Sequence, residues 1–201
     1  MKHTSSAVIL AAGHSSRMGK NKFAIELANG MTFLENIIIA YDKMECNSIV
    51  VVANSDGAAF FNSFLKNKYR GLQLAENHDV DRGRSYSIRL GLEKLKNCQS
   101  VFVHNVDNPY ADPEILKMMI ERIKDYDFVR ILNKGRGGHP VLLSAKIIEE
   151  ILSLKVEDIN LKNILTSNKG VGLEVSNSNI LININTVDDY EKFTFAQSGT
   201  G

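Results

Sequence analysis

The chain has 201 residues, of which 44% are hydrophobic and 23% charged, and its formal net charge is +1. This length provides one substantial core rather than two ordinary domains, and the balanced charge indicates neither a nucleic-acid nor a membrane surface. The two cysteines, Cys46 and Cys98, are far apart without zinc-ligand spacing, which favours a reducing compartment. The apolar run 7–12 is too short for a signal peptide or a membrane span, so we expect a cytoplasmic protein.

Short apolar runs with many β-branched residues alternate with segments of helical periodicity over the first part of the chain. This alternation is typical of a parallel sheet with crossover helices. The expected strands are 7–12, 48–53, 72–75, 100–104 and 128–132. The expected helices are 32–44, 58–66, 85–96 and 113–124.

The order of elements changes after residue 133. A glycine-rich turn is expected first, and the elements after it are a strand at 140–143, helices at 145–154 and 158–166, and a strand pair at 172–175 and 180–184. We expect this pair to form an antiparallel hairpin on a sheet edge. The predicted fold class is α/β, a three-layer α/β/α Rossmann-like fold with a mostly parallel sheet and a C-terminal antiparallel hairpin. One domain is expected over residues 1–196, with a disordered tail at 197–201.

The loop after the first expected strand, in the sequence LAAGHSSRMGKNK (residues 10–22), has the composition of an anion site. Small residues let backbone N–H groups approach phosphate oxygens, while hydroxyl and cationic side chains can balance a triphosphate. It is not a P-loop, because five residues separate Gly13 from Gly19 where that motif has four, and Asn21 stands at the Ser/Thr position. A dinucleotide-binding G-x-G-x-x-G turn is not in register either.

The ordered pattern LAAGxSSRMGxxK resembles the signature of the MobA-like NTP transferase family, within the nucleotide-diphospho-sugar transferase superfamily. The resemblance covers nearly the whole chain and implies a magnesium-dependent nucleotidyltransferase. The two alanines of this pattern, Ala11 and Ala12, resemble the molybdenum cofactor cytidylyltransferases, whereas the guanylyltransferases carry two glycines at these positions. The resemblance therefore favours CTP as the nucleotide. The resemblance also implies that Arg17 and Lys22 are catalytic cations. The implied nucleotide contacts of this loop are Leu10, Ala11, Ala12, Gly13, Ser15 and Ser16.

A second segment, NHDVDRGRSYS (residues 77–87), follows the third expected strand and opens a helix. A helix start offers unsatisfied N–H groups and a positive dipole end, both suited to a phosphate. The segment resembles the family's Asn…Gly…Ser-x-Ser pattern, which implies nucleotide contacts at Asn77, Gly83, Ser85 and Ser87. Ordinary helix capping by Ser85 is the structural alternative.

Asp107 comes at the end of the fourth expected strand, in the sequence HNVDNP. Mg²⁺ is usually held by one or two carboxylates together with substrate phosphates, so Asp107 is the expected metal ligand. Near the C-terminus, the sequence ININTVDD (residues 182–189) resembles a family ending whose Asx residues help to hold the metal. This implies that Asn183 or Asn185 joins Asp107, and the sequence leaves the choice between them open. The alternative is a plain strand-to-helix turn.

The acceptor half of the site is expected in the segments GRGGHPV (residues 135–141) and EDINLK (residues 157–162). The first resembles the family's Gly-x-Pro-Val segment and implies acceptor contacts from Arg136 and His139, against the alternative of a glycine hairpin with an exposed arginine. The second resembles Gly-Asp-x-Gly-Ala-Arg, which implies Asp158 and Lys162. Because lysine stands in place of arginine and cannot reproduce its planar recognition, the identity of the acceptor stays open.

The function predicted from these segments is transfer of a nucleoside monophosphate, CMP from CTP, onto a phosphate-bearing small molecule with release of pyrophosphate. The resemblance implies Mg²⁺ as cofactor, molybdenum cofactor as acceptor and a molybdoenzyme as partner. Alternatives within the superfamily are a guanylyltransferase and a sugar-phosphate nucleotidyltransferase. Outside it, a non-catalytic nucleotide- or cofactor-binding chaperone and a nicotinamide-dependent oxidoreductase are the rivals.

Overall fold

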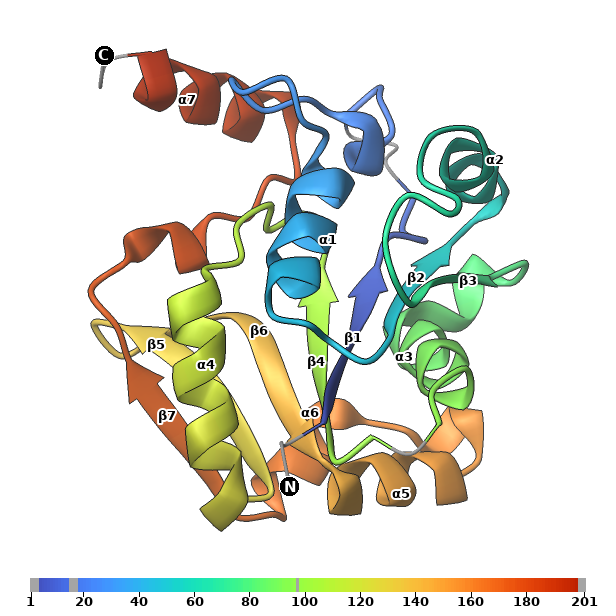
Figure 1. Cartoon of the computed structure of the whole chain (residues 1–201), viewed down its shortest axis with the longest axis vertical. Helices are drawn as coiled ribbons and strands as arrows, with labels where there is room; N and C mark the ends of the chain where they lie inside the picture. The colour runs from blue at the N-terminus through green and yellow to red at the C-terminus, as the bar shows by residue number, and fades with distance from the viewer. Residues whose placement is uncertain (1–3, 15–17, 97, 199–201) are drawn as a thin grey trace.

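A seven-stranded sheet forms the middle layer of the computed structural model, which describes residues 4–14, 18–96 and 98–198 (Figure 1). The strand order is β3-β2-β1-β4-β6-β5-β7. Only β6 among the described strands runs antiparallel to its neighbours, β4 and β5, and the other pairings are parallel. The strands are β1 Ser5–Leu10, β2 Ile49–Ala53, β3 Leu72–Glu76, β4 Ser100–Asn105, β5 Phe128–Asn133, β6 Arg136–Ser144 and β7 Gly170–Glu174.

Helices cover both faces of this sheet. The α-helices are α1 Phe33–Lys43, α2 Ser55–Phe64, α3 Gly83–Glu93, α4 Pro113–Arg122, α5 Ala145–Ser153, α6 Leu161–Thr166 and α7 Val187–Ser198. Short 3-10 turns are η1 Lys22–Ala24, η2 Val80–Arg82, η3 Ile123–Asp125, η4 Val156–Asp158 and η5 Ser178–Leu181. Among the described helices, none is long and apolar enough to cross a membrane.

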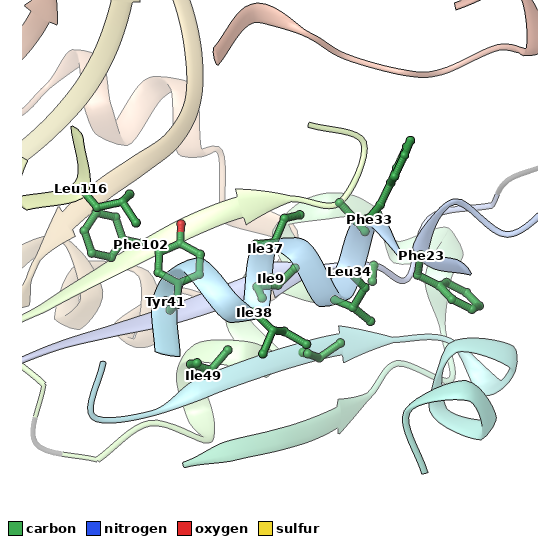
Figure 2. Close-up of a cluster of buried hydrophobic side chains, with 14 of the residues drawn as sticks. Ile9, Phe23, Phe33, Leu34, Ile37, Ile38, Tyr41, Ile49, Phe102 and Leu116 are labelled. Atoms are coloured by element: carbon green, nitrogen blue, oxygen red, sulfur yellow. The ribbon is translucent and has the colours of Figure 1, made fainter. Parts of the chain in front are cut away.

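Two separate apolar clusters define the layers. Side chains of α1, α2, α4 and α7 join one cluster on one face, while those of α3, α5 and α6 join the other. Figure 2 shows the first cluster around α1, where Tyr41 and Ile37 lie among side chains from the sheet and from α4. This α/β/α sandwich confirms the predicted fold class, including the antiparallel strand in the second half of the chain.

The prediction of a hairpin between 172–175 and 180–184 is wrong. The β7 strand lies parallel to β5, and the antiparallel hairpin is β5–β6 instead, with its turn at Lys134 and Gly135. The segment from Ile180 to Ile184 resembles a strand in sequence because isoleucines stand at alternate positions, but its polar contacts go to the end of β4. The Asn108 side chain donates to the Ile180 carbonyl at 2.7 Å, and the Ile184 amide donates to the Asp107 carbonyl at 2.8 Å.

Other boundaries differ by a few residues. The helix expected from 158 begins at Leu161, because Asn160 caps it by accepting from the Asn163 amide. Most of the expected glycine-rich turn belongs to β6, and α7 continues to Ser198, two residues into the expected tail.

The close approach of α3 to the sheet determines where the functional loops meet. Gly91 of α3 faces β1 and β2, and a Cβ atom there would lie 2.4 Å from Val8 Cγ1 and 2.9 Å from Val52 Cγ2. Such a contact would force the helix outward. Glycine therefore lets α3 pack directly on the two strands and brings its first turn beside the end of β1.

Candidate functional site

A cavity of about 300 Å³ opens where β1 and β4 end and α3 begins. Ligands in open α/β sheets bind outside the carboxyl ends of the strands, and this cavity is at that edge. It is lined by Leu10, Ala11, Ala12, Gly13, His14, Lys22, Val80, Gly83, Arg84, Ser87, Asn105, Val106 and Asp107.

Most of the residues expected to contact the nucleotide line this cavity. They are Leu10, Ala11, Ala12, Gly13, Gly83 and Ser87, with Lys22 and Asp107 from the expected catalytic set. Three further residues of the loop, Ser15, Ser16 and Arg17, lie outside the described part of the chain. Neither Asn77 nor Ser85 is among the lining residues.

Asn77 acts on the cavity through Ser87. Its side chain is buried, donates through Nδ2 to Ser87 Oγ at 3.0 Å and accepts through Oδ1 from the Asp79 amide at 2.9 Å. Because the Ser87 oxygen already accepts this bond, the Ser87 hydroxyl hydrogen remains available to donate into the cavity. Asn77 therefore positions Ser87 and the turn that leads into α3.

A chain of polar contacts through Asn185 and Asn183 joins Lys22 to Asp107, both of which line the cavity. Lys22 Nζ donates to Asn185 Oδ1 at 2.6 Å. In the amide orientation that satisfies its neighbours, Asn183 accepts from Asn185 Nδ2 at 3.2 Å and donates to the two Asp107 oxygens at 2.9 and 3.0 Å. Of the two asparagines that the sequence left open, Asn183 therefore contacts the carboxylate and Asn185 contacts the lysine.

The donor set at Asp107 fits a hard divalent cation. It combines one carboxylate with amide oxygens, and rotation of the Asn183 amide would turn its oxygen towards a cation there. Burial raises the pKa of Asp107, while the charges of Lys22 and Arg84 oppose that shift. The described residues contain no group of three or more His, Cys, Asp or Glu side chains that could hold a metal ion, so substrate phosphates would have to complete the coordination at Asp107.

His104, near the end of β4, is buried and hydrogen-bonded through both ring nitrogens. His104 Nε2 donates to the Asn108 carbonyl at 2.9 Å, and its Nδ1 accepts from the Tyr41 hydroxyl at 2.9 Å. Both ring nitrogens are used by the neutral form, because the carbonyl can only accept. Burial, with a smaller contribution from His139, lowers the pKa of His104 to about 3.

This burial predicts acid sensitivity. Unfolded His104 takes up a proton near its ordinary pKa of about 6.5, whereas the folded side chain does so only near 3, so the contribution of His104 to stability is present above pH 6.5 and falls as the pH drops. At pH 5 the expected loss from this residue is roughly 2 kcal/mol. Denaturant unfolding at pH 5 and 7 should show a smaller pH dependence for His104→Gln than for wild type. An unchanged dependence in His104→Gln would contradict the assignment.

A second cavity of about 580 Å³ lies between α6 and strands β5, β6 and β7. It contains two of the four residues expected to contact the acceptor, His139 and Lys162. The other two, Arg136 and Asp158, are exposed and do not line it. The complete lining is Arg84, Phe128, Arg130, His139, Val141, Leu161, Lys162, Leu165, Thr166, Asn168 and Gly170.

Arg84 lines both cavities, although the sequence indicated it only as an extra charge in the segment 77–87 and not as a residue shared with the acceptor side. Its position in the first turn of a helix that follows a strand end was the available signal. Asn105 was also missed, and it joins the two cavities, since its Nδ2 lies 3.1 Å from Nε2 of His139. Burial and the nearby Arg84 charge lower the pKa of His139 to about 4, so this side chain is neutral at pH 7.

The sequence is similar to known nucleotidyltransferases. A family model described as MobA-like NTP transferase domain matches residues 7–171. The chain is 27% identical to a probable molybdenum cofactor guanylyltransferase of Carboxydothermus hydrogenoformans, over 92% of each chain. It is 30% identical to a 2-C-methyl-D-erythritol 4-phosphate cytidylyltransferase of Clostridioides difficile, over 72% of this chain and 60% of that relative.

A solved structure shares the fold. The crystal structure of Rv0371C in complex with manganese, from Mycobacterium tuberculosis H37Rv, superposes with a TM-score of 0.78. The match covers 97% of this chain and 100% of that one at 19% identity.

Proposed function

The chain belongs to the MobA-like NTP transferase family, and we propose that it transfers CMP from CTP onto a phosphorylated small molecule with release of pyrophosphate. One observation carries the proposal, namely that Lys22, Arg84 and Asp107 converge on a single cavity beside the Leu10–Gly13 strand end. Cations and a carboxylate that face one cavity are what transfer at a triphosphate requires.

In the proposed reaction an oxygen of the acceptor phosphate attacks the α-phosphorus of the nucleotide. The new bond joins that oxygen to phosphorus, and the bond from phosphorus to the bridging oxygen of the β-phosphate breaks, so pyrophosphate leaves with the electron pair. No protein nucleophile is needed. Catalysis then depends on positioning and on stabilising the charge that develops on the phosphates.

Each side chain has a defined part in this scheme. Lys22, oriented by Asn185, neutralises charge on the phosphates, and Ser87, oriented by Asn77, donates to the nucleotide. Asp107, with Asn183, would hold Mg²⁺, which supplies charge neutralisation and orients the phosphates when bound. The manganese in the similar structure from Mycobacterium tuberculosis supports a divalent ion at this fold.

Two features support the choice of CTP and of the acceptor. The strand end carries Ala11 and Ala12, the form typical of cytidylyltransferases, and one of the two relatives described above is named as a cytidylyltransferase. The other is named for molybdenum cofactor, which we propose as the first acceptor to test. We also propose the cytoplasm as the compartment, because both cysteines of the described structure are free thiols and nucleoside triphosphates are available there.

The test is pyrophosphate release from each of the four NTPs with Mg²⁺, with and without an acceptor. The acceptors are molybdopterin-type cofactor and 2-C-methyl-D-erythritol 4-phosphate. Release that requires both CTP and one acceptor supports the proposal. Release with GTP instead would keep the reaction and change the nucleotide, whereas tight nucleotide binding without any release would favour a carrier that hands on its ligand without reaction.

A further inference from the structure

The turn after β4, residues 106–109, carries Asp107 and is held by distant parts of the fold. Its three consecutive carbonyl groups, at positions 107, 108 and 109, each accept a hydrogen bond from a different segment. The donors are, in that order, the Ile184 amide at 2.8 Å, His104 Nε2 at 2.9 Å and Asn36 Nδ2 of α1 at 2.9 Å. A buried network that is satisfied in this way makes the turn rigid.

The C-terminal segment at residues 180–185 brings Asn183 to this turn without belonging to the sheet. It pairs with none of the described strands, so its place depends on other contacts. Two of its backbone groups bond to the turn: the Ile180 carbonyl accepts from Asn108 Nδ2 at 2.7 Å, and the Ile184 amide donates at 2.8 Å. Because these two bonds lie on either side of Asn183 in the sequence, they determine how close its side chain comes to the carboxylate of the turn.

Strand β6 leaves room for the same carbonyl group. A Cβ atom at Gly138 would lie 2.5 Å from the Ile180 oxygen and 2.9 Å from Ile180 Cδ1, whereas one at Gly137 would meet nothing within 4 Å. The absence of a side chain at position 138 therefore lets η5 pack closely on β6, with its carbonyl within reach of Asn108.

Asn108 is enclosed by the protein and lies outside the first cavity. It is 1% exposed and is not among the residues that line that cavity. A buried amide that loses its partner is costly, so its bond to the Ile180 carbonyl favours the docked position of the segment. Since Asn108 follows Asp107 directly in the chain, a segment that is docked on Asn108 also lies beside the carboxylate.

We propose that Asn108 is a positioning residue, which docks the Ile180 carbonyl in the space left by Gly138 and thereby holds Asn183 and Asn185 in place. This inference rests on the proposed function and adds to it the contact that assembles the site. Asn108 acts through the segment 180–185 and touches neither substrate. Without this contact the chain of polar side chains between Lys22 and Asp107 loses its order, while the strand end that receives the nucleotide keeps its structure.

Two measurements on Asn108→Ala test this role. The kcat of acceptor-dependent pyrophosphate release is expected to fall about thirtyfold, whereas the KM for the NTP stays within about twofold of wild type, because the loss is one of positioning. Amide hydrogen exchange over residues 180–185, followed by mass spectrometry, should become faster in this variant, since the Ile184 amide is no longer held on the turn.

Asn133→Ala is the matched control. Asn133 is 7% exposed and donates through Nδ2 to the Val175 carbonyl at 2.8 Å, so its loss removes the same kind of buried contact shortly before η5. It should lower the free energy of unfolding as Asn108→Ala does, but leave kcat and the exchange of residues 180–185 near wild type. An equal fall of kcat in both variants would overturn the inference, because general loosening would then explain the loss.

Gly138→Ala disturbs the same contact without changing Asn108, and it keeps the test decisive if Asn108→Ala does not fold. The added methyl group is expected to displace the Ile180 carbonyl, to speed exchange of residues 180–185 and to lower kcat, whereas Gly137→Ala should behave like wild type. Exchange at the wild-type rate in both Asn108→Ala and Gly138→Ala would contradict the positioning role alone. Absence of acceptor-dependent pyrophosphate release in the wild type would instead contradict the proposed function, and the exchange rates would still test the docking of the segment.

Discussion

Asp107→Asn is expected to lower pyrophosphate release by about a thousandfold, the largest effect of any single change in this protein. The substitution keeps the shape of the side chain and removes its charge. The neutral amide can still contact Asn183, but it can neither hold a divalent cation firmly nor balance Lys22 and Arg84 across the cavity. Turnover is measured as acceptor-dependent pyrophosphate release at saturating NTP and Mg²⁺.

The stability of this variant distinguishes loss of chemistry from loss of fold. Burial raises the pKa of Asp107, so the charged carboxylate is less favourable in the folded protein than in the unfolded chain. The free energy of unfolding of Asp107→Asn should therefore equal or exceed that of wild type. Asp125→Asn, at an exposed position, is the matched control and should keep full activity. Activity above about a tenth of wild type in Asp107→Asn would remove the carboxylate from the mechanism.

Lys22→Met is expected to lower turnover on the order of a hundredfold, because a preorganised cation is lost from the phosphate site. Methionine retains an unbranched side chain, so the apolar part of the lysine is largely replaced. The expected loss appears in kcat more than in the KM for the acceptor. Lys20→Met changes a neighbouring lysine that does not line the cavity and should leave turnover near wild type.

A second variant separates the charge of Lys22 from its contact with Asn185. Asn185→Ala removes the side chain that accepts from Lys22 Nζ at 2.6 Å but keeps the cation. If Lys22 acts on the nucleotide, Asn185→Ala should lose far less activity than Lys22→Met. Equal losses in the two variants would show that Lys22 acts only by holding the 183–185 segment in place.

The first half of the fold could be predicted well because its signals are local. The β1, β2 and β4 strands are short apolar runs buried on both faces, and each is followed by a helix of clear periodicity. Parallel strands must end at the same edge, so the loops at residues 10–22 and 104–109 could be expected to meet. The cavity that contains Lys22 and Asp107 agrees with this reasoning.

The C-terminal part shows where local signals mislead. The run from Ile180 to Ile184 has the alternation of a strand, yet it contains a 3-10 turn and an extended segment that is held to the end of β4. Ile180 and Ile184 are buried in the apolar cluster around α1, and Ile182 packs partly buried against that cluster, although the segment pairs with none of the described strands. Hydrogen-bond partners more than 70 residues away in sequence determined this result, since Asn108 and Ile180 are separated by 72 positions.

The sequence by itself determined the class of fold, the family signature and the two loops that line the first cavity, because these depend on residue types at short spacing. The tertiary structure alone decided which asparagine contacts Asp107, that Asn77 works through Ser87, and that Arg84 serves both cavities. It also selected Arg130 and Lys162, and not Arg136, as cations of the second cavity. Charges from distant segments converge only after the sheet and helices pack, and spacing along the chain does not encode that distance.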